Sequence, residues 1–145
     1  MSANIRKMTL DDFYKISDIL ISDFDDFWSC DCLKQELNCK DSYFLVASID
    51  EEIIGFAGFK KILDEADIMN IVVNKQFRGQ GIGSLLLKDL ISYAESLCVS
   101  SITLEVNVKN SVAISLYHKF GFVDIGVRTK YYNGVDDGII MRKEI

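Results

Sequence analysis

Three glycines within five residues, Gly79, Gly81 and Gly83, constrain this chain more than any other feature. They lie between a β-like run over residues 68–73 and an amphipathic helical pattern over residues 85–97. A strand-to-helix turn without side chains lets successive backbone N–H groups converge on phosphate oxygens, and the helix adds the positive end of its dipole. The turn therefore predicts a phosphate-binding loop. The alternative is a glycine-rich loop that only reverses the chain.

The spacing of these glycines excludes the two most common phosphate loops. A P-loop needs Lys-Ser or Lys-Thr directly after its last glycine, and neither follows here. A dinucleotide-binding turn needs G-x-G-x-x-G after a first strand, whereas this turn lies in the middle of the chain. The spacing that remains is R-x-x-G-x-G, with Arg78 able to add a charge-assisted contact to a phosphate.

Length and composition predict one soluble domain spanning residues 1–145. Hydrophobic residues make up 49% of the chain and charged residues 26%, and the sequence has no proline and no visible linker. The net charge of −6 argues against nucleic-acid binding and suits a cationic peptide or amine. The sequence has neither an apolar run long enough to cross a membrane nor a signal-peptide core, so we expect a cytoplasmic protein without membrane association.

Cysteine and histidine usage argues against a metal site. The four cysteines, Cys30, Cys32, Cys39 and Cys98, lack the paired spacing of zinc ligands, and we expect free thiols. His118 is the single histidine, which also argues against a Ser-His-Asp or Cys-His catalyst.

Hydrophobic periodicity predicts a mixed α/β fold with the element order β-α-α-β-β-β-α-β-α-β-β. Thr9 is a candidate N-cap for the first helix, in which Phe13, Ile16, Ile19 and Leu20 recur at helical spacing. Further helices are expected over residues 30–39, from the glycine turn to about 97, and over 111–119. Strands are expected over residues 5–8, 43–49, 53–59, 66–73, 101–106, 122–129 and 138–142.

The whole pattern resembles the GNAT acyltransferases, and within them the bacterial ribosomal-protein-alanine N-acetyltransferases. The matching segments are Asn70-Ile71-Val72-Val73, Arg78-Gly79-Gln80-Gly81-Ile82-Gly83, Leu104-Glu105-Val106, Asn110-Ser111-Val112-Ala113-Ile114, Leu116-Tyr117 and Gly121-Phe122. The resemblance implies the GNAT fold, with a mostly antiparallel seven-stranded sheet and about four helices. One departure is Asn107, where the subgroup usually has arginine.

The resemblance implies acetyl-CoA as cosubstrate and no metal. Backbone groups of Ile71, Val72 and Val73 would hold the pantetheine arm, and Asn110 would bind the cosubstrate from the far side. The pyrophosphate would be bound by the loop residues Arg78, Gly79, Gln80, Gly81, Ile82, Gly83 and Ser84.

The resemblance also assigns an acid and a base. Glu105 would remove a proton from the acceptor amine, directly or through water, and Tyr117 would donate a proton to the departing thiolate. The residues alone leave an alternative for each. Glu105 shares one face of an alternating strand with Thr103 and could simply face solvent. Tyr117 could be a core aromatic.

Acceptor contacts are expected from Trp28 on one side and from Arg128, Tyr131 and Tyr132 on the other. The function implied is acetyl transfer, in a ternary complex, to a protein N-terminal α-amine, with the N-terminal alanine of a small-subunit ribosomal protein as acceptor. Two alternatives stay open: a GNAT enzyme for a small amine such as a polyamine, amino acid or antibiotic, and a non-catalytic acyl-CoA sensor.

Overall fold

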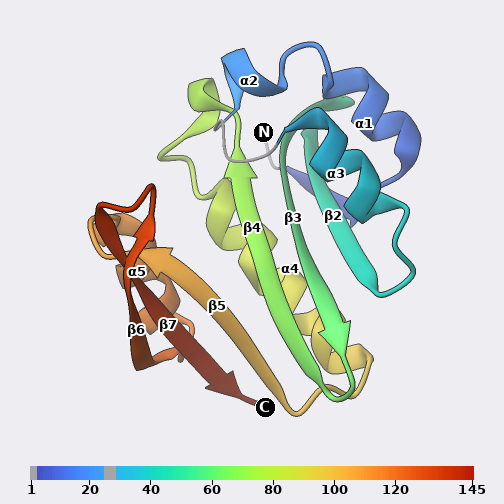
Figure 1. Cartoon of the computed structure of the whole chain (residues 1–145). Coiled ribbons are helices and arrows are strands. Elements are labelled where there is room, and N and C mark those ends of the chain that lie inside the picture. Colours follow the sequence, from blue (N-terminus) through green and yellow to red (C-terminus); the bar gives the residue numbers. More distant parts are fainter. Residues whose placement is uncertain (1–2, 25–28) are drawn as a thin grey trace.

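One sheet organises the computed structural model, which describes residues 3–24 and 29–145 (Figure 1). In that part of the chain seven strands lie in the order β1-β2-β3-β4-β5-β7-β6. All neighbours are antiparallel except β4 and β5, which run parallel. The strands are β1 (Asn4–Lys7), β2 (Ser42–Ile49), β3 (Glu52–Ile62), β4 (Glu65–Val73), β5 (Ser101–Asn107), β6 (Val123–Tyr132) and β7 (Asp136–Glu144). The mixed, mostly antiparallel seven-stranded sheet expected from the sequence is confirmed.

Helices cover both faces of this sheet. Figure 1 shows α4 behind the sheet and α1 and α3 in front of it. The helices are α1 (Leu10–Ile16), α2 (Leu20–Asp23), α3 (Cys30–Leu37), α4 (Ile82–Ser96) and α5 (Ser111–Lys119), with a 3₁₀ turn over Lys75–Phe77. The predicted element order is therefore confirmed, apart from one division in the first helix.

The predicted first helix is divided into α1 and α2. Thr9 caps α1 as expected, and its hydroxyl accepts a hydrogen bond from the backbone N–H of Asp12. The chain then leaves the helix after Ile16, and Leu20 begins α2. The turn leaves Ile19 exposed but buries Leu20 and Phe24 completely. Helical spacing alone places Ile19 and Leu20 on the same face, so only this tertiary packing separates them.

Two apolar cores follow from the alternation of side chains along the strands. On β2, Leu45 packs into the core beneath α4, whereas Phe44 and Val46 pack into the core beneath α1 and α3. Tyr117 of α5 also belongs to the α4 core, so α4 and α5 cover the same face.

The sheet opens between β4 and β5. These strands pair from Glu65–Ser101 to Asp67–Thr103, and beyond that point they separate (Figure 1). A bulge lies where the pairing ends: Ile68 and Asn70 of β4 pair with neighbouring residues of β3, which leaves Met69 without a partner on that strand. A bulge bends its strand and increases the local twist, and here it turns β4 away from β5.

Candidate functional site

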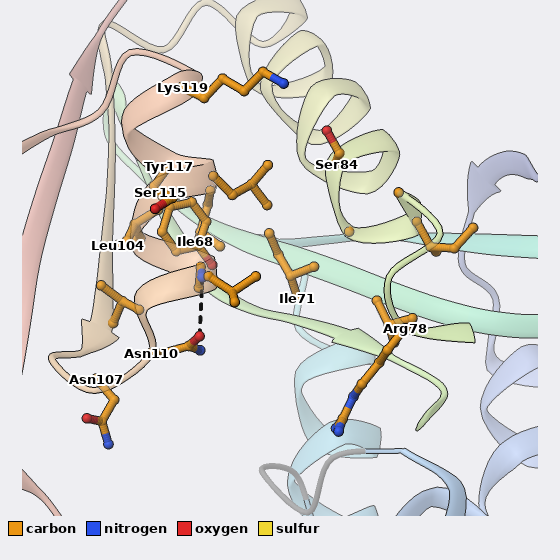
Figure 2. Close-up of a pocket in the computed structure, with 18 of the residues that line it drawn as sticks. Ile68, Ile71, Arg78, Ser84, Leu104, Asn107, Asn110, Ser115, Tyr117 and Lys119 are labelled. Carbon is orange, nitrogen blue, oxygen red and sulfur yellow. Dashed lines mark hydrogen bonds between the residues drawn. The ribbon is translucent and has the colours of Figure 1, made fainter. Parts of the chain in front are cut away.

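A cleft of about 1120 Å³ fills the gap between the separated strands. Its walls come from β4, the glycine turn with the start of α4, β5, and one side of α5 (Figure 2). Most of the predicted cofactor residues line it, namely Ile71, Val73, Arg78, Gly79, Gly81, Ile82, Gly83, Ser84 and Asn110. The structure therefore brings the glycine turn and the helix cap at Asn110 to the walls of one cleft.

The glycine turn needs glycine for its backbone conformation. Gly79 and Gly81 have φ values of 77° and 81°, in the left-handed region that other residues rarely adopt. A Cβ atom at either position would meet no atom of the described residues within 4 Å, so packing against them does not require glycine there. Gly81 is the N-cap of α4, and no side chain in the described part of the chain caps that helix. The first N–H groups of α4 therefore remain available to an anion.

Two of the predicted cofactor residues are not in the cleft lining. Val72 is fully buried in the core beneath α1 and α3, so a cofactor in the cleft could contact only its backbone. Gln80 is exposed at the turn. Arg78 lies at the rim, and in Figure 2 its side chain extends away from the first turn of α4.

Asn110 caps α5 from within the cleft wall. Its Oδ1 accepts a hydrogen bond from the backbone N–H of Ala113 at 3.2 Å, drawn as the dashed line in Figure 2. The cap satisfies one of the orphan N–H groups at the start of α5. Because the oxygen is engaged in this way, the amide nitrogen is the part of Asn110 that can donate to a ligand in the cleft.

Glu105 lies where β5 leaves β4, and its side chain is only 22% exposed. Its Oε1 lies 2.9 Å from Nη2 of Arg128. Its Oε2 is buried and has no hydrogen-bond partner among the residues that the structure describes. A solvent-facing strand residue would have water at both oxygens, so this alternative does not fit. An unpaired buried acceptor costs about 1–3 kcal/mol, which a ligand or water in the cleft would offset.

Tyr117 is both a core residue and a cleft residue. Its ring packs edge-on against Phe122 with centroids 5.9 Å apart, and the residue is 9% exposed. It also lines the cleft from α5 (Figure 2). Burial, and then the neighbouring Tyr132, raise the pKa of Tyr117 to about 12. The hydroxyl is therefore a proton donor at neutral pH.

A second cavity of about 410 Å³ opens on the α3 side of the sheet. It has Ile68, Met69, Leu104, Glu105 and Tyr132 in common with the first cleft, and its other lining residues are Glu36, Lys60, Asp67, Thr103 and Tyr131. Alternation on β5 explains the arrangement, because Leu104 packs toward α4 and the next residue points to the other face. The separation of β4 and β5 thus gives Glu105 access from both faces.

The predicted acceptor contacts on β6 converge beside Glu105. The rings of Tyr131 and Tyr132 are perpendicular, with centroids 5.0 Å apart. Burial, and then the charge of Glu105, raise the pKa of Tyr132 to about 12. Arg128 contacts Glu105 directly, which sequence reasoning did not foresee. Trp28 lies outside the described residues, so its predicted role stays a prediction.

Several lining residues were missed by sequence reasoning. On α5, Val112, Ser115, Leu116 and Lys119 recur at helical spacing and face the cleft, with the Lys119 side chain reaching toward α4 (Figure 2). Projecting the helix from Asn110 would have found them. Glu36 and Lys60 of the second cavity come from α3 and β3, and no local signal links them to Glu105.

Residues 3–24 and 29–145 show neither a metal cluster nor a membrane-spanning helix. In that part of the chain, no group of three or more histidine, cysteine or acidic side chains is placed to hold a metal ion. No helix there has the length and apolar character needed to cross a membrane.

Comparison with known proteins agrees with this geometry. The model of the acetyltransferase (GNAT) family matches residues 13–122. A Salmonella typhimurium ribosomal protein bS18-alanine N-acetyltransferase is 38% identical over 67% of this chain and 68% of its own length. A Bacillus subtilis protein, to which the same activity is assigned provisionally, is 33% identical over 96% of this chain and 93% of its own. The crystal structure of the Escherichia coli ribosomal-protein-S18-alanine N-acetyltransferase superimposes with a TM-score of 0.90 at 29% identity, covering 99% of this chain and 94% of that one.

Proposed function

The chain belongs to the acetyltransferase (GNAT) family, and on that premise we propose that it transfers an acetyl group from acetyl-CoA to the N-terminal α-amine of a protein. The acceptor proposed is the N-terminal alanine of a small-subunit ribosomal protein. Relatives 33% and 38% identical to this chain carry that activity in their names. Transfer is direct, within a complex that holds both substrates.

One observation carries the proposal. Glu105 lines both cavities, and its buried Oε2 has no hydrogen-bond partner among the described residues. A donor in the larger cleft and an acceptor in the smaller cavity would meet beside this carboxylate. Direct transfer needs such a geometry, because two reactants must be held in contact and away from bulk water. A sensor that only binds an acyl-CoA would need neither the second cavity nor a free carboxylate oxygen.

The cleft residues fit acetyl-CoA. The uncapped N-terminus of α4 and the left-handed glycines would bind the pyrophosphate. The amide of Asn110 would donate to the cosubstrate from α5, and the edge of β4 past Asp67, which β5 no longer covers, would hold the pantetheine arm through backbone hydrogen bonds. When bound, acetyl-CoA supplies an acetyl group activated as a thioester.

Glu105 and Tyr117 would handle the two protons of the reaction. An N-terminal α-amine has an ordinary pKa of about 7.7–8.0, so it enters largely protonated at neutral pH and must lose a proton before it attacks. Oε2 of Glu105 is the acceptor for that proton, directly or through a water. The attacking nitrogen then forms a bond to the acetyl carbon as the carbon–sulfur bond breaks, and it releases its second surplus proton to water. Glu105 returns the first proton to water, and the thiolate gains one by way of Tyr117, which water reprotonates.

Tyr117 would stabilise the departing sulfur. Its pKa of about 12 keeps the hydroxyl protonated at neutral pH, so it can donate a hydrogen bond to the sulfur throughout the reaction. We therefore assign it first as a hydrogen-bond donor to the sulfur, and as the proton source only when the bond has broken. Tyr131 and Tyr132 would flank the acceptor terminus in the smaller cavity.

The test is mass spectrometry of acetyl-CoA incubated with the protein and a peptide that begins Ala-Arg and has a free N-terminus. A second peptide with a blocked N-terminus and one internal lysine is the control. We expect one acetyl group on the free terminus only. Modification of neither peptide, in a protein that still binds acetyl-CoA, would contradict the peptide acceptor and favour a small amine or a sensor.

The catalytic assignments are tested with Glu105→Gln and Tyr117→Phe, which keep the shape of each side chain. Each should lower kcat on the order of 10²-fold or more, because acid–base groups typically contribute that much. Glu144→Gln, on the exposed end of β7, is the matched control and should keep full activity. Unchanged turnover in Glu105→Gln would refute the base role.

A further inference from the structure

Arg128 reaches Glu105 across an intervening strand. The sheet order places β7 between β5 and β6, and Gly138 of β7 pairs with both Asn107 and Arg128. Because Gly138 has no side chain, Tyr131, Tyr132 and Oε2 of Glu105 occupy the space above it; a Cβ there would lie 3.2 to 3.5 Å from all three. Arg128 Nη2 therefore approaches Glu105 Oε1 to 2.9 Å with no side chain of Gly138 between them.

The guanidinium is itself held in place. Its central carbon lies 4.7 Å from the ring centroid of Tyr131, which in turn packs edge-on against Tyr132. Stacking on an aromatic ring restricts a long, flexible side chain and leaves the planar fork of N–H donors directed at a carboxylate. Arg128 of β6 is thus held in a restricted position beside Glu105 of β5.

Stability does not explain this ion pair. The Arg128 side chain is 53% exposed, and exposed ion pairs contribute only about 0–1 kcal/mol. The ion pair instead gives the two carboxylate oxygens of Glu105 different surroundings. Oε1 is occupied by Arg128, whereas Oε2 is buried beside Gly138 and has no hydrogen-bond partner among the described residues.

We propose that Arg128 is a positioning residue for Glu105, which fixes the carboxylate through Oε1 so that Oε2 faces the acceptor amine. The proposal depends on the base role of Glu105 proposed above. It differs from the substrate contact that the sequence predicts for Arg128. A substrate contact acts on acceptor binding, whereas a positioning residue acts on the chemical step through Glu105 alone.

The experiment compares steady-state kinetics of Arg128→Gln and Arg128→Lys with the wild-type protein. Misplacing a catalytic group by about 1 Å can cost about 10²-fold, so we expect kcat of Arg128→Gln to fall 10- to 100-fold, with KM for both substrates unchanged within threefold. Lysine keeps the charge and should restore part of kcat. Arg142→Gln, which removes an ion-paired arginine from the neighbouring β7, is the control and should have wild-type kinetics.

A double-mutant cycle gives the decisive readout. If Arg128 acts only through Glu105, then Arg128→Gln added to Glu105→Gln should cause no further loss of the residual rate, and peptide affinity should be the same in all four proteins. A raised KM or a weakened peptide Kd in Arg128→Gln would overturn the proposal and support the substrate contact. Full kcat in Arg128→Gln beside an inactive Glu105→Gln would also overturn it, yet leave the proposed function standing.

Discussion

Asp12 and Glu105 each pair with an arginine, and their surroundings separate a structural role from a chemical one. Asp12 is 1% exposed, and its oxygens accept from both Nη atoms of Arg6 at 2.7 Å and from the backbone N–H of Thr9 at 2.7 Å. Glu105 has one oxygen paired and the other buried without a partner. A fully satisfied carboxylate stabilises the fold, whereas a partly satisfied one is available to a ligand.

Asp12 should make stability depend on pH. The Arg6 guanidinium lowers the pKa of Asp12 from 3.8 to about 2, so its contribution is present above pH 4 and is lost as the pH falls toward 2. The shift corresponds to up to about 2 kcal/mol. Denaturant unfolding between pH 2 and pH 6 should show this loss in the wild type and not in Asp12→Asn. Asp11→Asn, on the exposed side of the same helical turn, is the control; an equal flattening there would contradict the assignment.

At the scale of elements, both cavities lie at one irregularity, the bulge at Met69, which lines each of them. Beyond it β4 and β5 no longer pair, which leaves the β4 edge for the proposed cosubstrate and the β5 face for the proposed acceptor. The following glycine turn then aims the start of α4 at the same opening. Strand, turn and helix thus position one site, and the turn can be tested separately from the rest.

Gly81→Ala should weaken acetyl-CoA binding more than it weakens the fold. Alanine in the left-handed region costs about 1 kcal/mol or more, and its Cβ would project into space that contains no protein atom within 4 Å. Gly134→Ala is a matched control, because Gly134 also has a left-handed φ, of 68°, and open space, but lies in the β6–β7 turn. Both variants should lose similar stability in thermal melts, and only Gly81→Ala should lose about tenfold or more in acetyl-CoA affinity by calorimetry. Equal affinities would place the pyrophosphate elsewhere.

At the scale of the whole molecule, local signals predicted most of the elements, and long-range packing decided the rest. The predicted bounds of α5 agree with the structure because Asn110 caps it and Gly121 follows its end. The division between α1 and α2 depends on burying Leu20 and Phe24, which helical spacing cannot show.

Contacts between residues far apart in the sequence also determine how the candidate site is built. The residues around the glycine turn could be grouped from the sequence because they are contiguous, and most of them line one cleft. The second cavity and the Arg128–Glu105 pair could not be predicted in this way, because both depend on how strands distant in sequence lie side by side. Sequence patterns therefore locate the larger cleft, proposed for acetyl-CoA, better than the second cavity, proposed for the acceptor.

The charge of the whole molecule bears on the acceptor half. The chain has a net charge of −6. Among the described residues, Glu36, Asp67 and Glu105 line the second cavity together with Lys60, and Arg128 lies beside Glu105, so acidic side chains still outnumber basic ones there. Such a field attracts a cationic peptide and is screened by salt, since the Debye length falls from about 30 Å at 0.01 M to about 3 Å at 1 M. The effect should appear as salt-dependent kcat/KM for a peptide that begins Ala-Arg.

We expect that kcat/KM to fall on the order of tenfold from low to high salt, while a peptide with glutamine in place of each arginine changes little. The comparison at matched pH, with acetyl-CoA saturating, isolates the acceptor, because any effect of salt on cosubstrate binding is then common to both peptides. Parallel salt dependence for the two peptides would mean that the acidic cavity does not select charge. The acceptor would then have to be recognised by its terminal amine and by contacts with Tyr131 and Tyr132 alone.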